Sequence, residues 1–229
     1  MTGTRKASVA KPTARAFADI RRPAQQRSRE RFEAILDGAE ALLQDLDPAD
    51  ISIHKIAAET GIAAPSIYHF FPETPSIFAA LAERYLRGFQ QRVNEVKLSR
   101  FTTWMDLQTY QFNQVRKYFN THAPARKVLL GPAYNFDIRT RDLNSDTVLA
   151  EKSLELTRRL FELPVIPNLL ERWVEVIVIS DAIWALSIHR YGTITDEMDE
   201  QARRARIAYS RTFLPEFLPL RREPPAAGK

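Results

Sequence analysis

Apolar residues recur at intervals of three and four along most of the chain, which is the spacing of amphipathic α-helices. We find no convincing β-strand pattern and no internal repeat, so the predicted fold class is all-α. The expected helices span about 25–44, 52–60, 64–70, 74–97, 102–119, a short stretch after Pro124, 145–163, 168–190 and 196–218. Residues 134–142 carry aromatic and charged side chains without a clear period.

The stretch 52–71 predicts two short helices joined by a tight turn. Ile53 and Ile56 give the first helix a small apolar face, and Ile67 turns inward from the second. Gly61 supplies the backbone freedom that a turn between crossed helices needs. This is the helix-turn-helix pattern, in which the second helix enters the major groove of DNA. The alternative interpretation is an ordinary helical hairpin inside a larger core.

A longer string of letters goes beyond this generic motif. Residues 56 and 57 read IA, and four residues on from that alanine the chain reads GIAAPSIYHFF. In order, spacing and aromatic ending, the string resembles the signature of the TetR family of bacterial transcription regulators. The resemblance implies an N-terminal three-helix DNA-binding head with a helix-turn-helix, followed by a C-terminal helical body that binds a ligand and dimerises.

The resemblance also implies which residues of the motif contact DNA. Ala64, Pro65 and Ser66 fall in the exposed first turn of the recognition helix, where base edges are read. Tyr68 and His69 follow on the same helix and would reach a phosphate or a base edge, although Tyr68 can also be a packing residue and His69 a plain surface residue. The recognition helix holds no arginine, so it lacks the commonest contact to guanine.

Further candidate phosphate contacts lie around the motif. Ser52 opens its first helix and could donate to a phosphate. His54 and Lys55 lie on the outer side of that helix and are weaker candidates. Arg27 and Arg29 stand at the start of the preceding helix, close to where the family makes backbone contacts. Thr74 can cap the next helix, with Pro75 in the first helical position. The family usually has a lysine near Thr74, and its absence here puts that phosphate contact in doubt.

Charge is distributed unevenly along the chain. The 229 residues carry a net charge of +5, but residues 1–31 alone hold nine basic and two acidic residues, so the remainder is slightly acidic. Residues 1–22 also have low hydrophobicity and no helical stripe, which predicts a flexible basic arm. Such an arm suits contact with DNA phosphates and a steep salt dependence of binding, although a merely solubilising tail would have the same composition.

Composition excludes several other classes of protein. The chain has no cysteine, which rules out disulfides and thiolate chemistry, and its four histidines are scattered. It lacks glycine-rich phosphate loops and metal-binding spacings, so we expect neither a cofactor nor a metal, and an all-α enzyme is a remote alternative. No export signal and no apolar run long enough to cross a membrane are evident, which favours a cytoplasmic protein.

The last two predicted helices suit a dimer interface. The helix at 168–190 is apolar on several sides and therefore needs cover on several sides. The final helix shows one stripe that includes Ala202, Ala205, Tyr209, Phe213 and Phe217. The family joins two such helices from each subunit into a four-helix bundle, and a dimer would set two recognition helices about 34 Å apart on palindromic operator DNA. Burial within one subunit is the alternative.

The middle helices have the composition of a ligand pocket. Members of the family usually hold a small effector there, and an apolar cavity with a few polar groups is the usual make-up of such a site. A stripe of aromatic residues at helical spacing is, however, more often plain core. The candidate ligand-binding residues are Trp104, Gln108, Phe112, Phe119, Trp173, Asp181 and Trp184.

Together these observations predict a homodimeric transcriptional repressor that a small, largely apolar effector releases from double-stranded DNA. The expected organisation is a basic arm at 1–22, a helix-turn-helix domain at 23–73, an effector-binding and dimerisation domain at 74–220, and a disordered tail at 221–229. The alternative is a DNA-binding protein of the same fold that has no small-molecule effector and is controlled by a protein partner or serves one.

Overall fold

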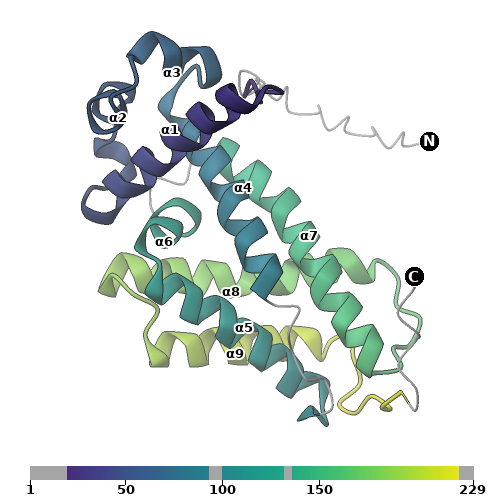
Figure 1. The fold of residues 1–229 in the computed structure, drawn as a ribbon. Helices are drawn as coiled ribbons and strands as arrows, with labels where there is room; N and C mark the ends of the chain where they lie inside the picture. Colours follow the sequence, from purple (N-terminus) through teal and green to yellow (C-terminus); the bar gives the residue numbers. More distant parts are fainter. Residues whose placement is uncertain (1–19, 93–99, 132–135, 222–229) are drawn as a thin grey trace, which may run out of the picture.

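The computed structural model describes residues 20–92, 100–131 and 136–221, and this part of the chain is helical (Figure 1). The predicted all-α class is confirmed, since the described residues hold no strand beyond one isolated antiparallel bridge between Phe161 and Leu220. A short 3-10 helix, Pro48–Asp50, follows α1. The α-helices are α1 (Gln26–Asp45), α2 (Ile53–Thr60), α3 (Ala64–Phe70), α4 (Thr74–Arg92), α5 (Trp104–Thr121), α6 (Ala123–Leu129), α7 (Phe136–Leu160), α8 (Leu169–Tyr191) and α9 (Asp196–Ser210).

Helices α1, α2 and α3 form a head at one end of the molecule (Figure 1). Ile35 of α1, Ile56 of α2 and Ile67 of α3 are all fully buried and belong to the same apolar cluster. Gly38 allows α1 and α2 to approach closely, because a Cβ atom at that position would lie 2.1 Å from the Cγ2 atom of Thr60. The apolar stripe of α1 therefore covers the helix-turn-helix pair, as the sequence predicts.

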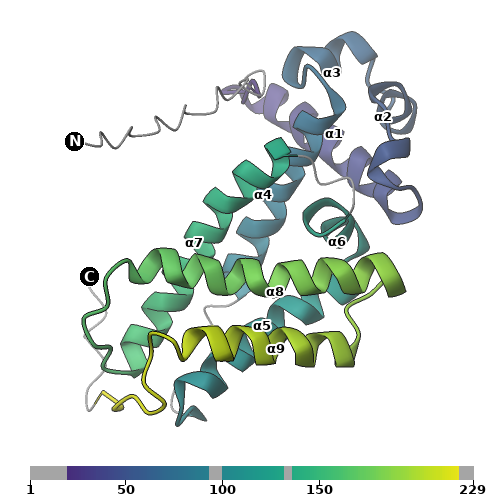
Figure 2. The same cartoon turned by 180° about the vertical axis from the view of Figure 1, so that it is seen from behind.

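The remaining helices form the body, which α4 joins to the head (Figure 1). Helices α8 and α9 lie side by side across one face of the body, with α5 behind them (Figure 2). Helix α5 runs antiparallel to α9, because Gln108 Nε2 bonds to Ser210 Oγ at one end and Arg116 Nη2 to Asp196 Oδ1 at the other. The body interior is thus enclosed by helices that are far apart in sequence.

The helix boundaries match the predictions closely in the head and less well in the body. Helix α2 ends just before Gly61 and α3 ends at Phe70, as predicted, and Thr195 caps α9 by accepting from the N–H of Met198 at 3.2 Å. Helix α7 begins at Phe136, so the start predicted at residue 145 is wrong. Parts of the predicted arm, tail and fourth helix fall at 1–19, 222–229 and 93–97, outside the described residues.

The final helix also ends earlier than predicted. It stops at Ser210, and residues 211–221 return in a non-helical path along the end of α7, where the N–H of Arg221 bonds to the carbonyl of Leu160 at 2.9 Å. Pro215 explains the difference, since it disfavours helical backbone at the preceding residue. The expected helical stripe therefore breaks, and Phe217 is 75% exposed instead of lining α9.

Candidate DNA-binding surface

The turn between α2 and α3 is fixed by one glycine and one threonine. Gly61 adopts a left-handed backbone with φ of +67°, which a residue with a side chain rarely adopts. Thr60 Oγ1 donates to the carbonyl of Ile56 at 2.8 Å and accepts from the N–H of Ile62 at 3.2 Å. These bonds cap the end of α2 and set the direction in which α3 leaves the turn.

Helix α3 is held to the head by one face and presents the other to solvent. Ile67 and Phe70 are buried, and the ring of Phe70 meets that of Phe32 edge-on with centroids 6.0 Å apart. Tyr68 is 48% exposed, and its neighbour His69 is exposed as well. The two candidate contact residues therefore lie on the side of α3 that faces away from the core.

The first turn of α3 is also accessible. Pro65 is exposed, while Ala64 and Ser66 are half-buried. Pro65 lies in the first turn of the helix, where the N–H that proline lacks has no helical partner to lose. The three candidate base-reading positions thus lie together at one end of the helix that also carries Tyr68.

The residues predicted to contact phosphates differ in exposure and in the hydrogen bonds that they already make within the head. Ser52 Oγ accepts from the N–H of Lys55 at 3.3 Å and so caps α2, and Lys55 Nζ donates to the carbonyl of Asp50 at 2.7 Å. Arg27 and Arg29 are exposed in the first turns of α1. Thr74 is half-buried and is the first residue of α4, directly after the loop that follows α3.

The end of the basic arm docks beside α3, which the sequence did not reveal. The N–H of Arg21 donates to the carbonyl of Phe70 at 3.2 Å, and Ile20 packs against the apolar core of the head. Arg22 pairs with Glu83 of α4. Residues 20–22, the described end of the predicted arm, therefore lie beside the last turn of α3 and the start of α4.

Comparisons with known proteins agree with this geometry. Residues 35–81 match the family model described as bacterial regulatory proteins, tetR family. Over 64 residues the chain is 39% identical to the HTH-type transcriptional regulator EthR of Mycobacterium tuberculosis, a match that covers 28% of this chain and 30% of that protein. The resemblance of the helix-turn-helix region to the TetR family is confirmed over these residues.

Solved structures extend the likeness in fold beyond the head. A TetR-family transcriptional regulator from Streptomyces coelicolor superposes with a TM-score of 0.62 at 18% identity, covering 81% of this chain and 98% of that one. SmeT, the repressor of the Stenotrophomonas maltophilia multidrug efflux pump SmeDEF, gives a TM-score of 0.56 at 15% identity, covering 81% and 91%. At these identities the match shows a shared TetR fold, and the TetR family is one of regulators, not of enzymes.

Head and body meet at a cluster of charged residues that the sequence did not predict. Arg84 of α4 pairs with Asp37 at 2.6 Å, with Glu33 at 3.5 Å and with Glu40, all three on α1. Burial lowers the pKa of Arg84, but its bonds to Asp37 and Glu40 outweigh that effect and raise it above the usual value. The acidic residues recur at helical spacing, which predicts a charged face on α1 but not its partner.

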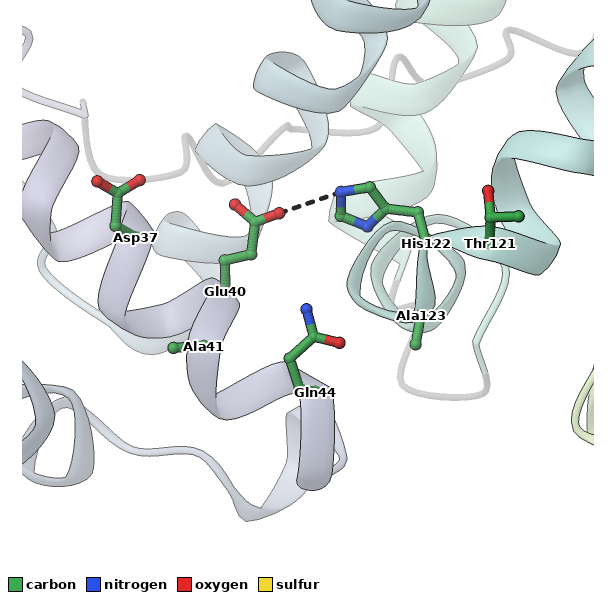
Figure 3. Close-up of a pocket in the computed structure, with 7 residues that line it drawn as sticks. All are labelled: Asp37, Glu40, Ala41, Gln44, Thr121, His122 and Ala123. Carbon is green, nitrogen blue, oxygen red and sulfur yellow. Dashed lines mark ion pairs between the residues drawn. The ribbon is translucent and has the colours of Figure 1, made fainter.

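A polar cavity of about 300 Å³ lies beside this cluster, between α1 and the junction of α5 with α6 (Figure 3). Its lining residues are Asp37, Glu40, Ala41, Gln44, Thr121, His122 and Ala123. His122 Nε2 lies 3.2 Å from Glu40 Oε1, across the boundary between head and body (Figure 3). None of the candidate ligand-binding residues lines this cavity.

Those seven candidates lie instead in the body, and five of them belong to two apolar clusters. Phe112, Phe119 and Trp184 come together, with ring centroids of Phe112 and Trp184 5.8 Å apart. Trp104 and Trp173 belong to the second cluster, near the end of α9. The remaining two are polar: Gln108 is 2% exposed and Asp181 is half-buried on α8.

Each of the three indole N–H groups in this set has an identified acceptor. Trp104 Nε1 donates to the carbonyl of Pro215 at 2.9 Å, Trp173 Nε1 to Ser153 Oγ at 3.0 Å, and Trp184 Nε1 to Asp199 Oδ1 at 3.0 Å. These bonds fix the tryptophans as parts of the packed interior in this structure. A ligand that entered here would therefore displace existing packing.

No helix within residues 20–92, 100–131 and 136–221 combines the length and the apolar character needed to cross a membrane.

Proposed function

We propose that this protein is a homodimeric transcriptional repressor that binds operator DNA through α3 and is released by a small, largely apolar effector. The observation that carries the proposal is the solvent-facing side of α3, with Pro65 and Tyr68 exposed while Ile67 and Phe70 anchor the helix in the core. In a helix-turn-helix, this side of the second helix lies in the major groove. The domain division at residues 22, 73 and 220 belongs to the same proposal.

Backbone contacts supply much of the affinity in this proposal. Pro65 and Ala64 offer base edges only apolar contact, such as to a thymine methyl group. Arg27 and Arg29 are exposed on α1, and Arg21 lies beside Phe70 at the end of α3. Contacts of these side chains with phosphates position the head without reading sequence. The protein acts on DNA in the cytoplasm.

The outer face of α8 and α9 supports the dimer. Val178, Ala182 and Leu186 follow one another at intervals of four along α8, and Leu186 is 40% exposed. On α9, Ala205 is half-buried and Ala208 exposed, so a neighbouring helix can approach closely. Apolar surface of this kind in a pair of adjacent helices (Figure 2) suits association with a second copy.

The effector acts in the body and its effect reaches the head through α5. The C-terminal end of α5 meets His122, which lies against Glu40 of α1. A change in the packing of Phe112 or Trp184 would shift α5 and thereby the contact between body and head. A ligand can release DNA in this way only if it binds the two arrangements with different affinity.

Footprinting with the purified protein on DNA adjacent to its own gene tests the proposal. We expect protection of a palindromic site on one face of the helix, and a mass in solution of two subunits. A protein that protects no specific site across that region would contradict a role as a local repressor. Thermal unfolding in the presence of apolar metabolites then separates the effector-responsive regulator from the alternative without an effector, because a ligand of the native state raises the melting temperature.

A further inference from the structure

Arg206 of α9 is completely enclosed by the body. Its exposed fraction is 0%, which places it among the largest fully buried side chains in the described part of the chain. None of its three guanidinium nitrogens, Nε, Nη1 and Nη2, has a hydrogen-bond partner there. A guanidinium group carries five N–H donors, so this is an unusual concentration of unused hydrogen-bonding capacity in a protein interior.

The surroundings of Arg206 compensate its charge only weakly. The guanidinium carbon lies 4.4 Å from the centre of the Phe112 ring, a cation–π contact. Asp199, two helical turns away on α9, already accepts from Trp184 Nε1 at 3.0 Å and pairs with Arg116 at 3.5 Å. Burial accordingly lowers the pKa of Arg206 to about 10, so the side chain remains charged at neutral pH.

Two glutamines of α5 leave further polar atoms unused in the same interior. Gln108 Nε2 donates to Ser210 Oγ at 3.2 Å, one turn beyond Arg206, but its Oε1 atom has no partner among the described residues. Gln111 Oε1 accepts from Ser153 Oγ at 2.9 Å, but its Nε2 atom has none there. Phe112 follows these glutamines on α5 and carries the guanidinium on its ring. Gln108 is bonded toward α9 through Ser210, whereas Gln111 is bonded toward α7 through Ser153.

An enclosed charge without a partner is strongly unfavourable, whereas the same charge is stabilised once an opposite charge bonds to it. We propose that Arg206 is the anion-binding group of a ligand site in the body, and that it takes the carboxylate of a small acid whose remainder is apolar. A single uncompensated guanidinium matches a single negative charge, and its two parallel N–H groups match the two oxygens of a carboxylate.

The apolar remainder follows from the neighbouring side chains. Phe112, Phe119 and Trp184 form an aromatic cluster, and Phe112 carries the guanidinium on its ring. Because Arg206 is closed off from solvent, access requires α5 and α9 to separate locally. This inference rests on the proposed effector site, and it specifies the chemical class of the effector.

Thermal unfolding and titration calorimetry with matched small molecules test the inference. The probes are octanoate, dodecanoate and phenylpropanoate below their micellar concentrations, with dodecanol and dodecylamine as neutral and cationic counterparts. We expect at least one carboxylate to raise the melting temperature of the full chain progressively as its concentration increases, and its neutral and cationic counterparts to bind about ten- to a hundredfold more weakly. Failure of all three carboxylates, or equal binding of dodecanol and dodecanoate, would overturn the inference.

Substitutions then assign the binding to this side chain. Arg206→Met removes the charge and keeps an apolar side chain, so the variant is expected to fold and to lose the preference for the acid over the alcohol. Arg206→Lys keeps the positive charge but lacks the two parallel N–H groups of the guanidinium, so this variant should bind the acid with intermediate affinity. Arg203→Met is the matched control, because Arg203 lies on the same helix, half-exposed and bonded to Glu200 at 2.6 Å. An Arg206→Met variant that binds the acid as well as the natural chain contradicts the inference.

The binding measurement uses no DNA, so it stands apart from the proposed function. If the acid binds through Arg206 but the protein protects no operator, the ligand site is upheld and the regulatory role fails. If the operator is protected but no acid binds, the regulatory role is upheld and the inference fails.

Discussion

Glu40 and His122 meet across the boundary between head and body, with Oε1 of the carboxylate 3.2 Å from Nε2 of the imidazole (Figure 3). The other imidazole nitrogen, Nδ1, accepts from the N–H of Ala125 at 3.4 Å and so caps α6. The ring centroids of Tyr85 and Tyr118 lie 5.1 and 5.2 Å from that of His122, with Tyr85 edge-on and Tyr118 tilted. One side chain thereby links the end of α5, the start of α6 and the first helix of the head.

The charged cluster beside this contact should stabilise the junction. Replacing Arg84 by methionine leaves Glu33, Asp37 and Glu40 close together without a cation, and we expect the free energy of unfolding to fall by about 2 kcal/mol. Urea denaturation measures the loss. Arg87→Met is the control, because Arg87 is 55% exposed and lies 3.8 Å from Glu83, and its effect should stay within about 0.5 kcal/mol. Equal losses in the two variants would contradict a structural role for the cluster.

The turn of the helix-turn-helix depends on the left-handed backbone of Gly61. Gly61→Ala is expected to lower the free energy of unfolding by about 1–2 kcal/mol, because a Cβ atom strains that conformation even where space is open. Gly88→Ala, within α4, also places its Cβ in open space but at an ordinary helical conformation, and should stabilise the protein by about 0.5–1 kcal/mol. Opposite signs in the two thermal unfolding curves are the expected result.

Tyr68 is the side chain on α3 whose removal should affect DNA binding most clearly. Tyr68→Ala is expected to weaken binding to the protected site by about 1–3 kcal/mol, while thermal stability stays nearly unchanged because the ring is 48% exposed. Gel-shift titration measures the affinity. Phe217→Ala removes another exposed aromatic ring, far from the head, and should leave DNA affinity as it was. An unaltered affinity in the Tyr68 variant would argue against α3 as the recognition helix.

The arginines at the start of α1 should account for part of the salt dependence. In the double variant Arg27→Gln with Arg29→Gln, the slope of log K against log salt concentration is expected to become shallower by about 2, since each lost phosphate contact removes about one counterion. The control changes Arg158 and Arg159, exposed at the end of α7, to glutamine, which alters the net charge equally. A similar change of slope in both variants would mean that only overall charge matters.

The proposed dimer gives α8 a testable role. Leu186→Glu places a charge on the outer face of α8, where Leu186 is 40% exposed, and is expected to shift the protein from dimer to monomer in sedimentation experiments. Val148→Glu introduces the same charge at a residue of α7 that is 39% exposed. This control should remain dimeric. A dimer that persists in the Leu186 variant would place the interface elsewhere.

The head illustrates how much local sequence can predict. Gly61, the apolar spacing of Ile53, Ile56 and Ile67, and the proline at residue 65 fix where α2 and α3 begin and end, because each acts through its immediate neighbours. The body illustrates the limit. The end of α9 depends on Pro215 and on where residues 211–221 can pack, and the spacing of Phe213 and Phe217 alone indicated a longer helix.

By itself, the sequence determined the all-α class, the resemblance of the head to the TetR family and the basic region ahead of the head, since periodicity, a contiguous motif and charge are properties of neighbouring residues. Only the tertiary structure decided which charges meet. The pairing of Arg84 with α1 spans 44 residues or more, and the isolation of Arg206 beneath Phe112 is visible only when α5 and α9 are packed together. Burial and partnership depend on the whole fold, because they are set by every helix that surrounds a side chain.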